Sequence, residues 1–345
     1  MKKEKANENL RNAIHRLMDE DETVVVLGED VMEPYGGAFK ITKGLSDEFP
    51  ERVLGTPISE EGFVNMASGM AIMGLKPIVD MMFSDFATLS FDPLLNFASK
   101  SVTMYGKKLD LSMIIRCANG GYRGYGATHS QSMQKYFMGI PNLSVYEMSP
   151  FHDNYDVLKR ILSENIPGMF FEEKITYAQY MYTDGEINEL FNFSYAGEDQ
   201  NWAIAAIDQE STPDCLVICP GGLASMCLAV ADKLIMEDEI EVKVCVPSKL
   251  YPCRVEDIAG EAAAARKVLI VEEGTPGGSW GEGIAVKLYP YVLSGKEGAI
   301  ELLCSSDSII PASVQYEQKV LVSEQDIYEG VLRLMGKEAV KGGQR

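Results

Sequence analysis

The stretch Thr56-Pro57-Ile58-Ser59-Glu60-Glu61-Gly62-Phe63 lies between an acidic, turn-rich segment and an apolar run over 64–73. Thr56 and Ser59 are residue types that cap helices, and proline is tolerated in a first helical turn. The stretch therefore predicts the start of a helix. Two interpretations of its acids stay open. They complement the positive end of the helix dipole, or they belong to a functional site.

Strand and helix patterns alternate on both sides of this stretch. Short apolar runs at 23–27, 77–83 and 111–116 are separated by longer helical patterns, and a second alternating series begins at Cys215. Alternation of this kind is typical of a parallel sheet wrapped by helices. We predict the α/β fold class, with two domains that each contain a mostly parallel sheet.

The chain of 345 residues is long enough for two domains. We predict a first domain over residues 1–182 and a second over 213–345. The segment 183–212 is acidic and has poor hydrophobic spacing. These features indicate a linker with some irregular strands.

Composition narrows the class of partner. The formal charge of −20 argues against nucleic acid or an anionic membrane, because both require a basic surface. No apolar run is long enough to span a bilayer, and the N-terminus lacks the apolar core of a secretory signal. The seven cysteines form no C-x-x-C pair, which is typical of a reducing compartment. We expect a cytoplasmic protein with no membrane partner.

Several common site motifs are absent from the sequence. It contains no P-loop, no G-x-G-x-x-G after the first strand and no G-x-S-x-G elbow. The three histidines are too scattered for a zinc motif, so we expect no metal site in this chain. The glycine-rich segment Gly274–Gly283 is surrounded by acids, which favours a tight turn over an anion site.

Two features remain as candidates for chemistry. His129 lies in the polar loop 127–131, where its imidazole either transfers protons or makes a hydrogen bond that stabilises the loop. Phe83, Phe86 and Phe91 lie near the end of a predicted strand. Their rings either pack in the core or stack on a heteroaromatic cofactor.

The motifs Leu27–Asp30, Gly37–Leu45, 56–63, Gly74–Ile78 and His129–Gln131 follow one another in this order. Together they resemble the β subunit of the E1 component of thiamine-diphosphate-dependent 2-oxoacid dehydrogenases, the family of the pyruvate and branched-chain enzymes. The resemblance covers nearly the whole chain. It implies a transketolase-like pyrimidine-binding domain followed by a transketolase C-terminal-like domain.

The resemblance also implies an α2β2 enzyme whose thiamine diphosphate is shared between subunits. The α partner would hold the diphosphate through Mg²⁺, and this chain would hold the aminopyrimidine. A β–β contact would complete the assembly. A small 2-oxoacid would be decarboxylated, and its acyl group would pass to the lipoyl domain of an E2 partner.

Site residues carry over by position. Glu60 matches the catalytic acid that hydrogen-bonds N1′ of the pyrimidine. Phe86 matches the ring that stacks on the pyrimidine, and Ile58 and Met82 match residues that line the pocket. His129 matches the catalytic histidine of the active-site loop, which would position the substrate carboxylate or donate a proton to the incoming lipoyl group.

Two segments depart from the family pattern. The loop 120–126 contains two tyrosines and Arg123, where many relatives have smaller residues. Arg123 either recognises an extra carboxylate or phosphate on the substrate or lies in a surface loop that meets the α partner. The segment 310–321 lacks the usual approach to the last helix, which leaves E2 docking there open.

Two other functions remain as alternatives. One is half of a split transketolase-like or acyloin-type thiamine diphosphate enzyme that acts on a sugar or phosphorylated substrate. The other is a scaffold without catalytic activity. The His129-Ser130-Gln131 motif favours the dehydrogenase over the first alternative, and the presence of Glu60, Phe86 and His129 argues against the scaffold.

Overall fold

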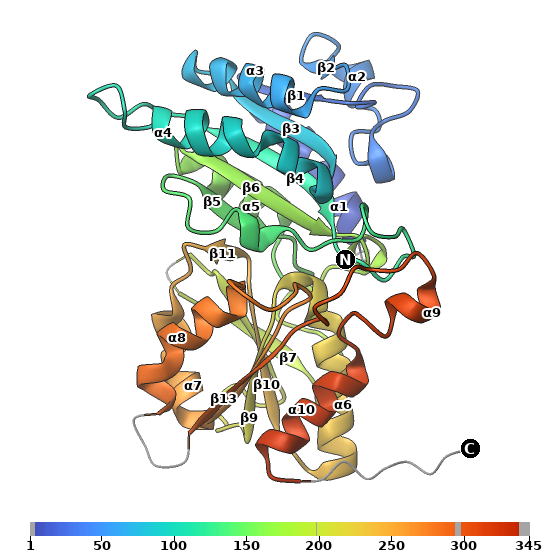
Figure 1. The fold of residues 1–345 in the computed structure, drawn as a ribbon, viewed down its shortest axis with the longest axis vertical. Helices are drawn as coiled ribbons and strands as arrows, with labels where there is room; N and C mark the ends of the chain where they lie inside the picture. The colour runs from blue at the N-terminus through green and yellow to red at the C-terminus, as the bar shows by residue number, and fades with distance from the viewer. Residues whose placement is uncertain (1–3, 198, 294–297, 338–345) are drawn as a thin grey trace. The chain divides into compact units, whose positions relative to one another are not determined.

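The computed structural model describes residues 4–197, 199–293 and 298–337. These residues form two compact units, which are drawn in Figure 1. The first unit runs to Met181 and includes Lys249–Pro252. The second unit runs from Tyr182 to Ser248 and resumes at Cys253. Each unit is an α/β layer structure, which confirms the predicted fold class.

The first unit contains a seven-stranded sheet in the order β11-β5-β6-β4-β3-β1-β2. All neighbours in it are parallel except β11, which pairs with β5 in the antiparallel direction. The strands are β1 (Val24–Gly28), β2 (Val53–Gly55), β3 (Lys76–Phe83), β4 (Met113–Asn119), β5 (Ser144–Glu147), β6 (Pro167–Glu173) and β11 (Lys249–Tyr251).

Helices and short helical turns cover this sheet. The long helices α1 and α5 pack against each other, and Asn9 of α1 accepts a hydrogen bond from the backbone N–H of Asn154 at the start of α5 (2.9 Å). The helices are α1 (Ala6–Glu20), α2 (Leu45–Glu48), α3 (Glu60–Ile72), α4 (Ser99–Ser101) and α5 (Asn154–Ser163). The short turns are η1 (Ala38–Lys40), η2 (Ser84–Ser90), η3 (Pro93–Ala98), η4 (Gln134–Tyr136) and η5 (Thr176–Ala178).

The helical pattern between the predicted strands 77–83 and 111–116 forms three short pieces instead of one helix. The 3₁₀ turn η2 precedes the π-helical η3, and α4 follows directly. The hydroxyls of Thr88 and Ser90 hydrogen-bond the carbonyls of Asp85 and Ala87. Pro93 contributes no N–H to the helix. Both effects compete with regular α-helical hydrogen bonds.

The second unit contains a six-stranded sheet in the order β13-β12-β9-β10-β8-β7. The strands β13, β12, β9 and β10 are mutually parallel, whereas β8 and β7 are antiparallel to their neighbours. The strands are β7 (Asn192–Ala196), β8 (Trp202–Ala206), β9 (Cys215–Ile218), β10 (Val242–Pro247), β12 (Lys267–Val271) and β13 (Ala299–Leu303).

The segment 183–212, predicted as a linker with some irregular strands, contains β7 and β8, which are two regularly paired strands of this sheet. Every residue of β8 is buried, and the indole N–H of Trp202 donates to the carbonyl of Arg254 (2.9 Å). Exposed polar residues in β7 and acidic turns on both sides of the strand conceal the pattern in the sequence.

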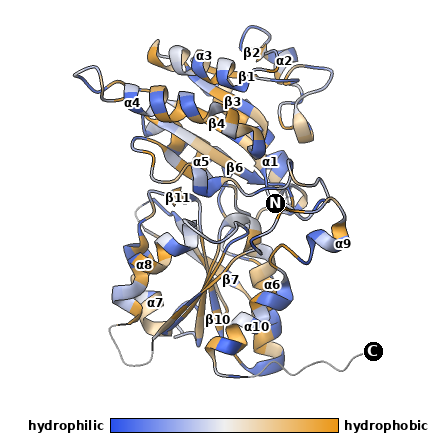
Figure 2. Ribbon diagram, viewed as in Figure 1, coloured by the Kyte–Doolittle hydropathy of each residue, from blue (hydrophilic) through white to orange (hydrophobic). Residues whose placement is uncertain are grey.

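Helices lie on both faces of the second sheet, with α7 and α8 on one side and α6 and α10 on the other (Figure 1). Hydrophobic residues concentrate in the strands between them (Figure 2). Ser323 caps the last helix, because its hydroxyl accepts the N–H of Asp326. The helical elements are η6 (Gly221–Leu223), α6 (Ala224–Asp238), η7 (Val255–Ile258), α7 (Ala259–Ala265), α8 (Trp280–Val292), α9 (Val314–Glu317) and α10 (Glu324–Leu334).

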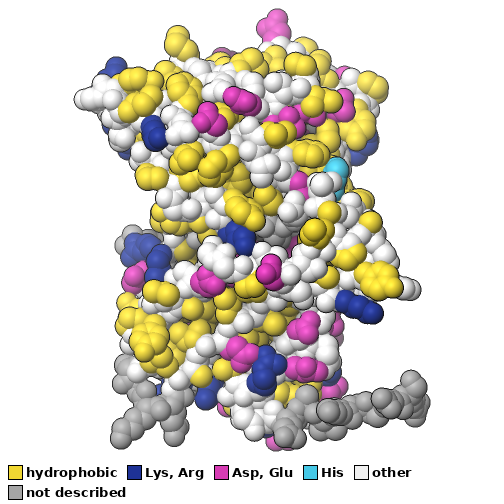
Figure 3. Space-filling view, viewed as in Figure 1, with side chains coloured by type: hydrophobic (Ala, Val, Ile, Leu, Met, Phe, Trp, Pro, Cys, Tyr) yellow, Lys and Arg dark blue, Asp and Glu magenta, His cyan; other side chains and the backbone are white. Residues whose placement is uncertain are grey.

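The acidic side chains on the surface and the free cysteines agree with what the composition indicates. On the face shown in Figure 3, acidic and hydrophobic side chains are interspersed over both units. Six of the seven cysteines are buried and all are free thiols. Within the described ranges, no helix is both long and apolar enough to cross a membrane.

Candidate functional site

The candidate site lies at one edge of the first sheet. The strands β2, β1, β3, β4 and β6 are parallel neighbours, so their carboxyl ends meet at this edge, where open α/β sheets place their ligands. The segments that leave these ends carry Ile58 and Glu60 after β2, Phe86 after β3 and His129 after β4. Met82 is the penultimate residue of β3 itself. All five predicted site residues are therefore at or next to this edge.

Glu60 is the first residue of α3 and its side chain is buried, whereas the adjacent Glu61 is exposed. Ser59 occupies the N-cap position but its side chain makes no capping hydrogen bond. Nearby, the N–H of Thr56 donates to the carbonyl of Gly28 (2.9 Å), which fastens the approach to α3 onto the end of β1.

A second acid, Glu29, lies close to Glu60. Burial raises the pKa of Glu29, and the carboxylates of Glu60, Asp30 and Asp80 raise it further. Glu29 Oε1 and Thr56 Oγ1 are buried atoms without a hydrogen-bond partner among the described residues. The acidic region at the start of α3 thus contains buried polar atoms to which no described residue of the chain is hydrogen-bonded.

Ile58 is 83% exposed, although isoleucine is among the residue types most often buried. It lies two residues before the buried Glu60. The chain therefore presents an apolar side chain to the outside directly beside a buried acid.

Met82 adopts a left-handed backbone conformation with φ of 60°, which is unfavourable for a side chain of this size. Its N–H donates to Oδ1 of Asp80 (2.9 Å), and the register between β3 and β4 shifts between Asp80 and Phe83. An irregularity of this kind redirects side chains at the end of a strand.

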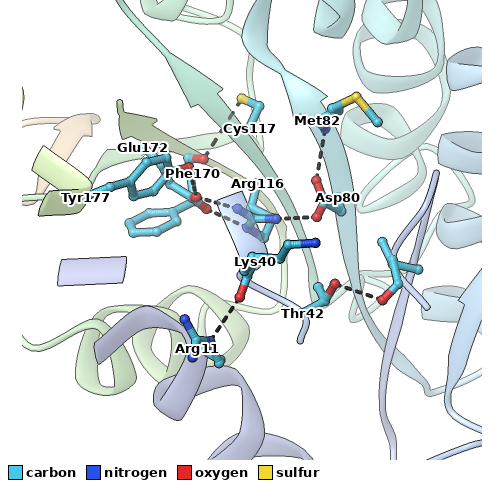
Figure 4. A network of polar contacts seen from close by, with 11 residues as sticks. Arg11, Lys40, Thr42, Asp80, Met82, Arg116, Cys117, Phe170, Glu172 and Tyr177 are labelled. Carbon is cyan, nitrogen blue, oxygen red and sulfur yellow. Dashed lines mark hydrogen bonds and ion pairs between the residues drawn. The ribbon is translucent and has the colours of Figure 1, made fainter. Parts of the chain in front are cut away.

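A buried ion network holds Asp80 in place (Figure 4). The guanidinium of Arg116 donates to Asp80 Oδ2 (2.5 Å) and to both carboxylate oxygens of Glu172 (2.6 and 2.5 Å). The Tyr177 hydroxyl donates to Glu172 Oε2 (2.7 Å). Burial raises the pKa of Glu172. Burial alone would lower the pKa of Arg116, but the two carboxylates raise it.

None of the sequence motifs indicates this network. A usable signal was nevertheless present, because Asp80, Arg116 and Glu172 each interrupt a strand that is otherwise largely apolar. Buried charges in neighbouring strands require partners. The register supplies the first pair, since Asp80 and Arg116 are direct partners in the β3–β4 ladder.

His129 contacts the aromatic residues at the end of β3. Its ring lies 4.9 Å from the ring of Phe83 and 5.2 Å from that of Phe86, both in edge-on geometry. The hydroxyl of Thr128 is 3.0 Å from His129 Nδ1. The structure thus brings the predicted residues Phe86 and His129 into direct contact, with Phe83 and Tyr125 completing an aromatic cluster.

The rest of the histidine motif is fastened to the same strand end. The Gln131 side-chain amide donates to Asp85 Oδ1 (2.7 Å), and the Ser84 hydroxyl donates to the Gln131 carbonyl (3.2 Å). Arg123, in the same loop, is exposed and donates to the carbonyl of Lys174 (3.3 Å). In this structure Arg123 therefore joins its own loop to the residue that follows β6.

Two units with these sheets define a transketolase-like protein. Residues 4–179 match the family model described as "Transketolase, pyrimidine binding domain", and residues 204–327 match "Transketolase, C-terminal domain". The chain belongs to this family, and within it to the β subunits of E1 components of the 2-oxoacid dehydrogenase type. Enzymes of this family depend on thiamine diphosphate in general.

Individual relatives span nearly the whole chain. A pyruvate dehydrogenase E1 component subunit beta from Rickettsia conorii is 29% identical, covering 95% of this chain and 97% of its own length. The acetoin:2,6-dichlorophenolindophenol oxidoreductase subunit beta of Bacillus subtilis is 30% identical, covering 96% and 97%. A solved structure titled "Split gene transketolase, inactive beta4 tetramer" has a TM-score of 0.73 at 18% identity, covering 97% of this chain and 99% of its own, and supports the fold.

Proposed function

We propose that this chain is the β subunit of an E1 enzyme that decarboxylates a 2-oxoacid and transfers the acyl group to a lipoyl group of E2. The names of the relatives support the enzyme class. The observation that carries the proposal is the buried Glu60 at the start of α3, at the same sheet edge as the Phe86–His129 pair.

The residues of this edge fit the aminopyrimidine of thiamine diphosphate. Glu29 Oε1 and Thr56 Oγ1 are buried without partners among the described residues, and an aminopyrimidine offers both donors and acceptors. The exposed side chain of Ile58 and the ring of Phe86 suit its flat apolar faces. Glu60 would then hydrogen-bond N1′, with Ile58, Met82 and Phe86 lining the ring.

When bound, thiamine diphosphate supplies a carbon nucleophile and an electron sink for decarboxylation. This chain would hydrogen-bond N1′ through the carboxyl group of Glu60, which lies buried at the start of α3. Phe86 orients the pyrimidine ring. His129, held against Phe86, orients the substrate carboxylate or donates a proton to the incoming lipoyl sulfur.

The α partner would complete the site. We propose that it holds the diphosphate through Mg²⁺ in an α2β2 assembly with a β–β contact. Among the described residues of this chain, no cluster of three metal-ligating side chains occurs. We also propose that the first unit is the pyrimidine-binding domain, that the second unit, with β7 and β8 in its sheet, is the C-terminal domain, and that the enzyme is cytoplasmic.

The proposal is tested by producing the chain together with an E1 α subunit and supplying thiamine diphosphate and Mg²⁺. A panel of 2-oxoacids with an artificial electron acceptor should reveal turnover of at least one of them. A complex that binds the cofactor but oxidises no 2-oxoacid would contradict the proposed reaction.

The relative from Bacillus subtilis gives a second candidate, an acyloin-cleaving enzyme, because it is 30% identical and is named for acetoin. The same assay with acetoin in place of the 2-oxoacid separates the two. Preference for acetoin over every 2-oxoacid would favour the second candidate.

A further inference from the structure

Lys174 follows β6 at the carboxyl edge of the first sheet, and its side chain is completely buried at 0% exposure. Neither the sequence motifs nor the proposed function assigns a role to Lys174. A buried ammonium is unfavourable unless it is hydrogen-bonded, so its surroundings deserve an explanation.

The Lys174 ammonium contacts the histidine loop at the histidine itself. Nζ donates a hydrogen bond to the backbone carbonyl of His129 (3.0 Å). The same ammonium lies 5.7 Å from the ring centroid of Phe83 and 6.0 Å from that of Tyr125, at the outer limit of cation–π contact. One side chain therefore touches the His129 backbone and two rings of the aromatic cluster.

The backbone of Lys174 holds two other points of the same loop. Its N–H donates to the carbonyl of Asn119, where the loop leaves β4 (3.1 Å). Its carbonyl accepts from the guanidinium of Arg123 in the middle of the loop (3.3 Å). The beginning, the middle and the histidine of the loop thus converge on a single residue.

The neighbouring Glu173 adds another hydrogen bond between the end of β6 and the loop. It is buried, and it accepts a hydrogen bond from the side-chain amide of Asn119. Burial raises the pKa of Glu173, while the charge of Lys174 counteracts that effect. The end of β6 therefore fastens the loop through a carboxyl group and an ammonium together.

We propose that Lys174 is a positioning residue for His129, which it holds edge-on to Phe83 and Phe86 through the ammonium-to-carbonyl hydrogen bond. This inference rests on the proposed function, in which His129 assists acyl transfer. A shift of about 1 Å in a catalytic group is enough to slow a step roughly a hundredfold. Loss of the Lys174 ammonium should therefore slow the step that uses His129 more than the other steps.

The variant Lys174→Met removes the ammonium and preserves an unbranched buried side chain. In the complex with the α subunit, we expect acyl transfer to lipoamide to fall at least about tenfold more than decarboxylation measured with an artificial acceptor. Lys174→Arg, which keeps a donor and a charge, should recover part of that ratio. In a His129→Ala background, Lys174→Met should cause little further loss, because the two residues would act in one unit.

Lys243 provides a matched control in the second unit. It is also buried, at 1% exposure, and its Nζ donates to a backbone carbonyl, that of Gln209 (2.7 Å). Lys243→Met should lower the thermal unfolding midpoint, as Lys174→Met does. It should leave the ratio of acyl transfer to decarboxylation unchanged.

Hydrogen exchange of the complex tests the anchor without reference to activity. We expect Lys174→Met to speed exchange over 120–131, whereas Lys243→Met leaves that segment unchanged. Unchanged exchange at the loop would overturn the proposal, and so would faster exchange with an unchanged ratio of the two steps. If the wild-type complex turns over no 2-oxoacid, the proposed reaction fails, and the exchange measurement alone then decides whether Lys174 holds the loop.

Discussion

The starts of α3 and α8 occupy comparable places, each following the carboxyl end of a strand in a parallel part of its sheet. At α8, the Ser279 hydroxyl accepts the N–H of Glu282, and the Glu282 carboxylate returns to the N–H of Ser279 (3.1 Å). Glu272 accepts the N–H of Gly281 (3.0 Å). Side chains of the chain itself thus accept hydrogen bonds from the backbone N–H groups in the first turn of α8.

The start of α3 is different. Ser59 makes no side-chain cap, Glu60 is buried, and an exposed Ile58 lies beside it. A helix start that is closed by its own capping box stabilises the fold. A helix start without such a box, with acid oxygens and an apolar side chain beside it, can instead contact a ligand. The comparison separates two acidic, glycine-containing helix starts that look alike in sequence.

The largest expected difference between the two helix starts lies in the effect of Glu60 on activity. We expect Glu60→Gln to lower turnover of the complex about a thousandfold, because an amide cannot exchange a proton at N1′. The neighbouring Glu61→Gln, at an exposed position, is the matched control and should retain activity. Steady-state rates with an artificial acceptor provide the measurement, and near-normal turnover of Glu60→Gln would refute the assigned role.

A smaller effect is expected from His129→Ala. It should slow acyl transfer to lipoamide roughly a hundredfold, the usual contribution of a general acid, and slow decarboxylation less. Single-turnover measurements of each step distinguish the two. Equal slowing of both steps would assign His129 to substrate positioning instead.

Glu272, which hydrogen-bonds the first turn of α8, is expected to affect stability and not activity. Burial raises the pKa of Glu272 above its ordinary value of 4.5. The folded state therefore favours the protonated acid, and this contribution is present below about pH 4.5 and lost as the pH rises through the raised value. Relative to Glu272→Gln, which does not titrate, the wild type should lose stability as the pH rises from 4.5. Unfolding midpoints across this range measure the difference, and a difference that is constant with pH would contradict it.

The smallest effect concerns the two caps. Ser279→Ala should lower the free energy of unfolding by about 1 kcal/mol, because it removes a capping hydrogen bond. Ser59→Ala, at a position without such a bond, should change it by only a few tenths of a kcal/mol. Denaturant titration of both variants checks the pair. Equal losses would mean that the two helix starts are capped alike.

The sequence was sufficient for features that depend on local pattern. Alternating runs predicted two mostly parallel sheets, and the family motifs included Phe86 and His129, whose rings contact each other at the edge of the first sheet. Lys174 and the Arg116 network were missed because their partners lie far away in the chain: Lys174 is 45 positions from His129 and Arg116 is 56 from Glu172. Irregular strands were predicted where β7 and β8 lie, but acidic turns concealed that both belong to the second sheet, because their pairing becomes apparent only when the sheet is assembled.

The short strand β11 has a consequence for how the protein can be divided. Residues Lys249–Tyr251 follow β10 of the second unit, yet they pair with β5 of the first sheet, and Lys249 forms an ion pair with Glu164 there. A fragment that ends at residue 182 would lack this strand and leave the edge of β5 open to pairing with other chains. The two units are therefore poor candidates for separate expression. A gene fusion, a circular permutation or a split version of this protein would have to keep residues 249–252 with the first unit.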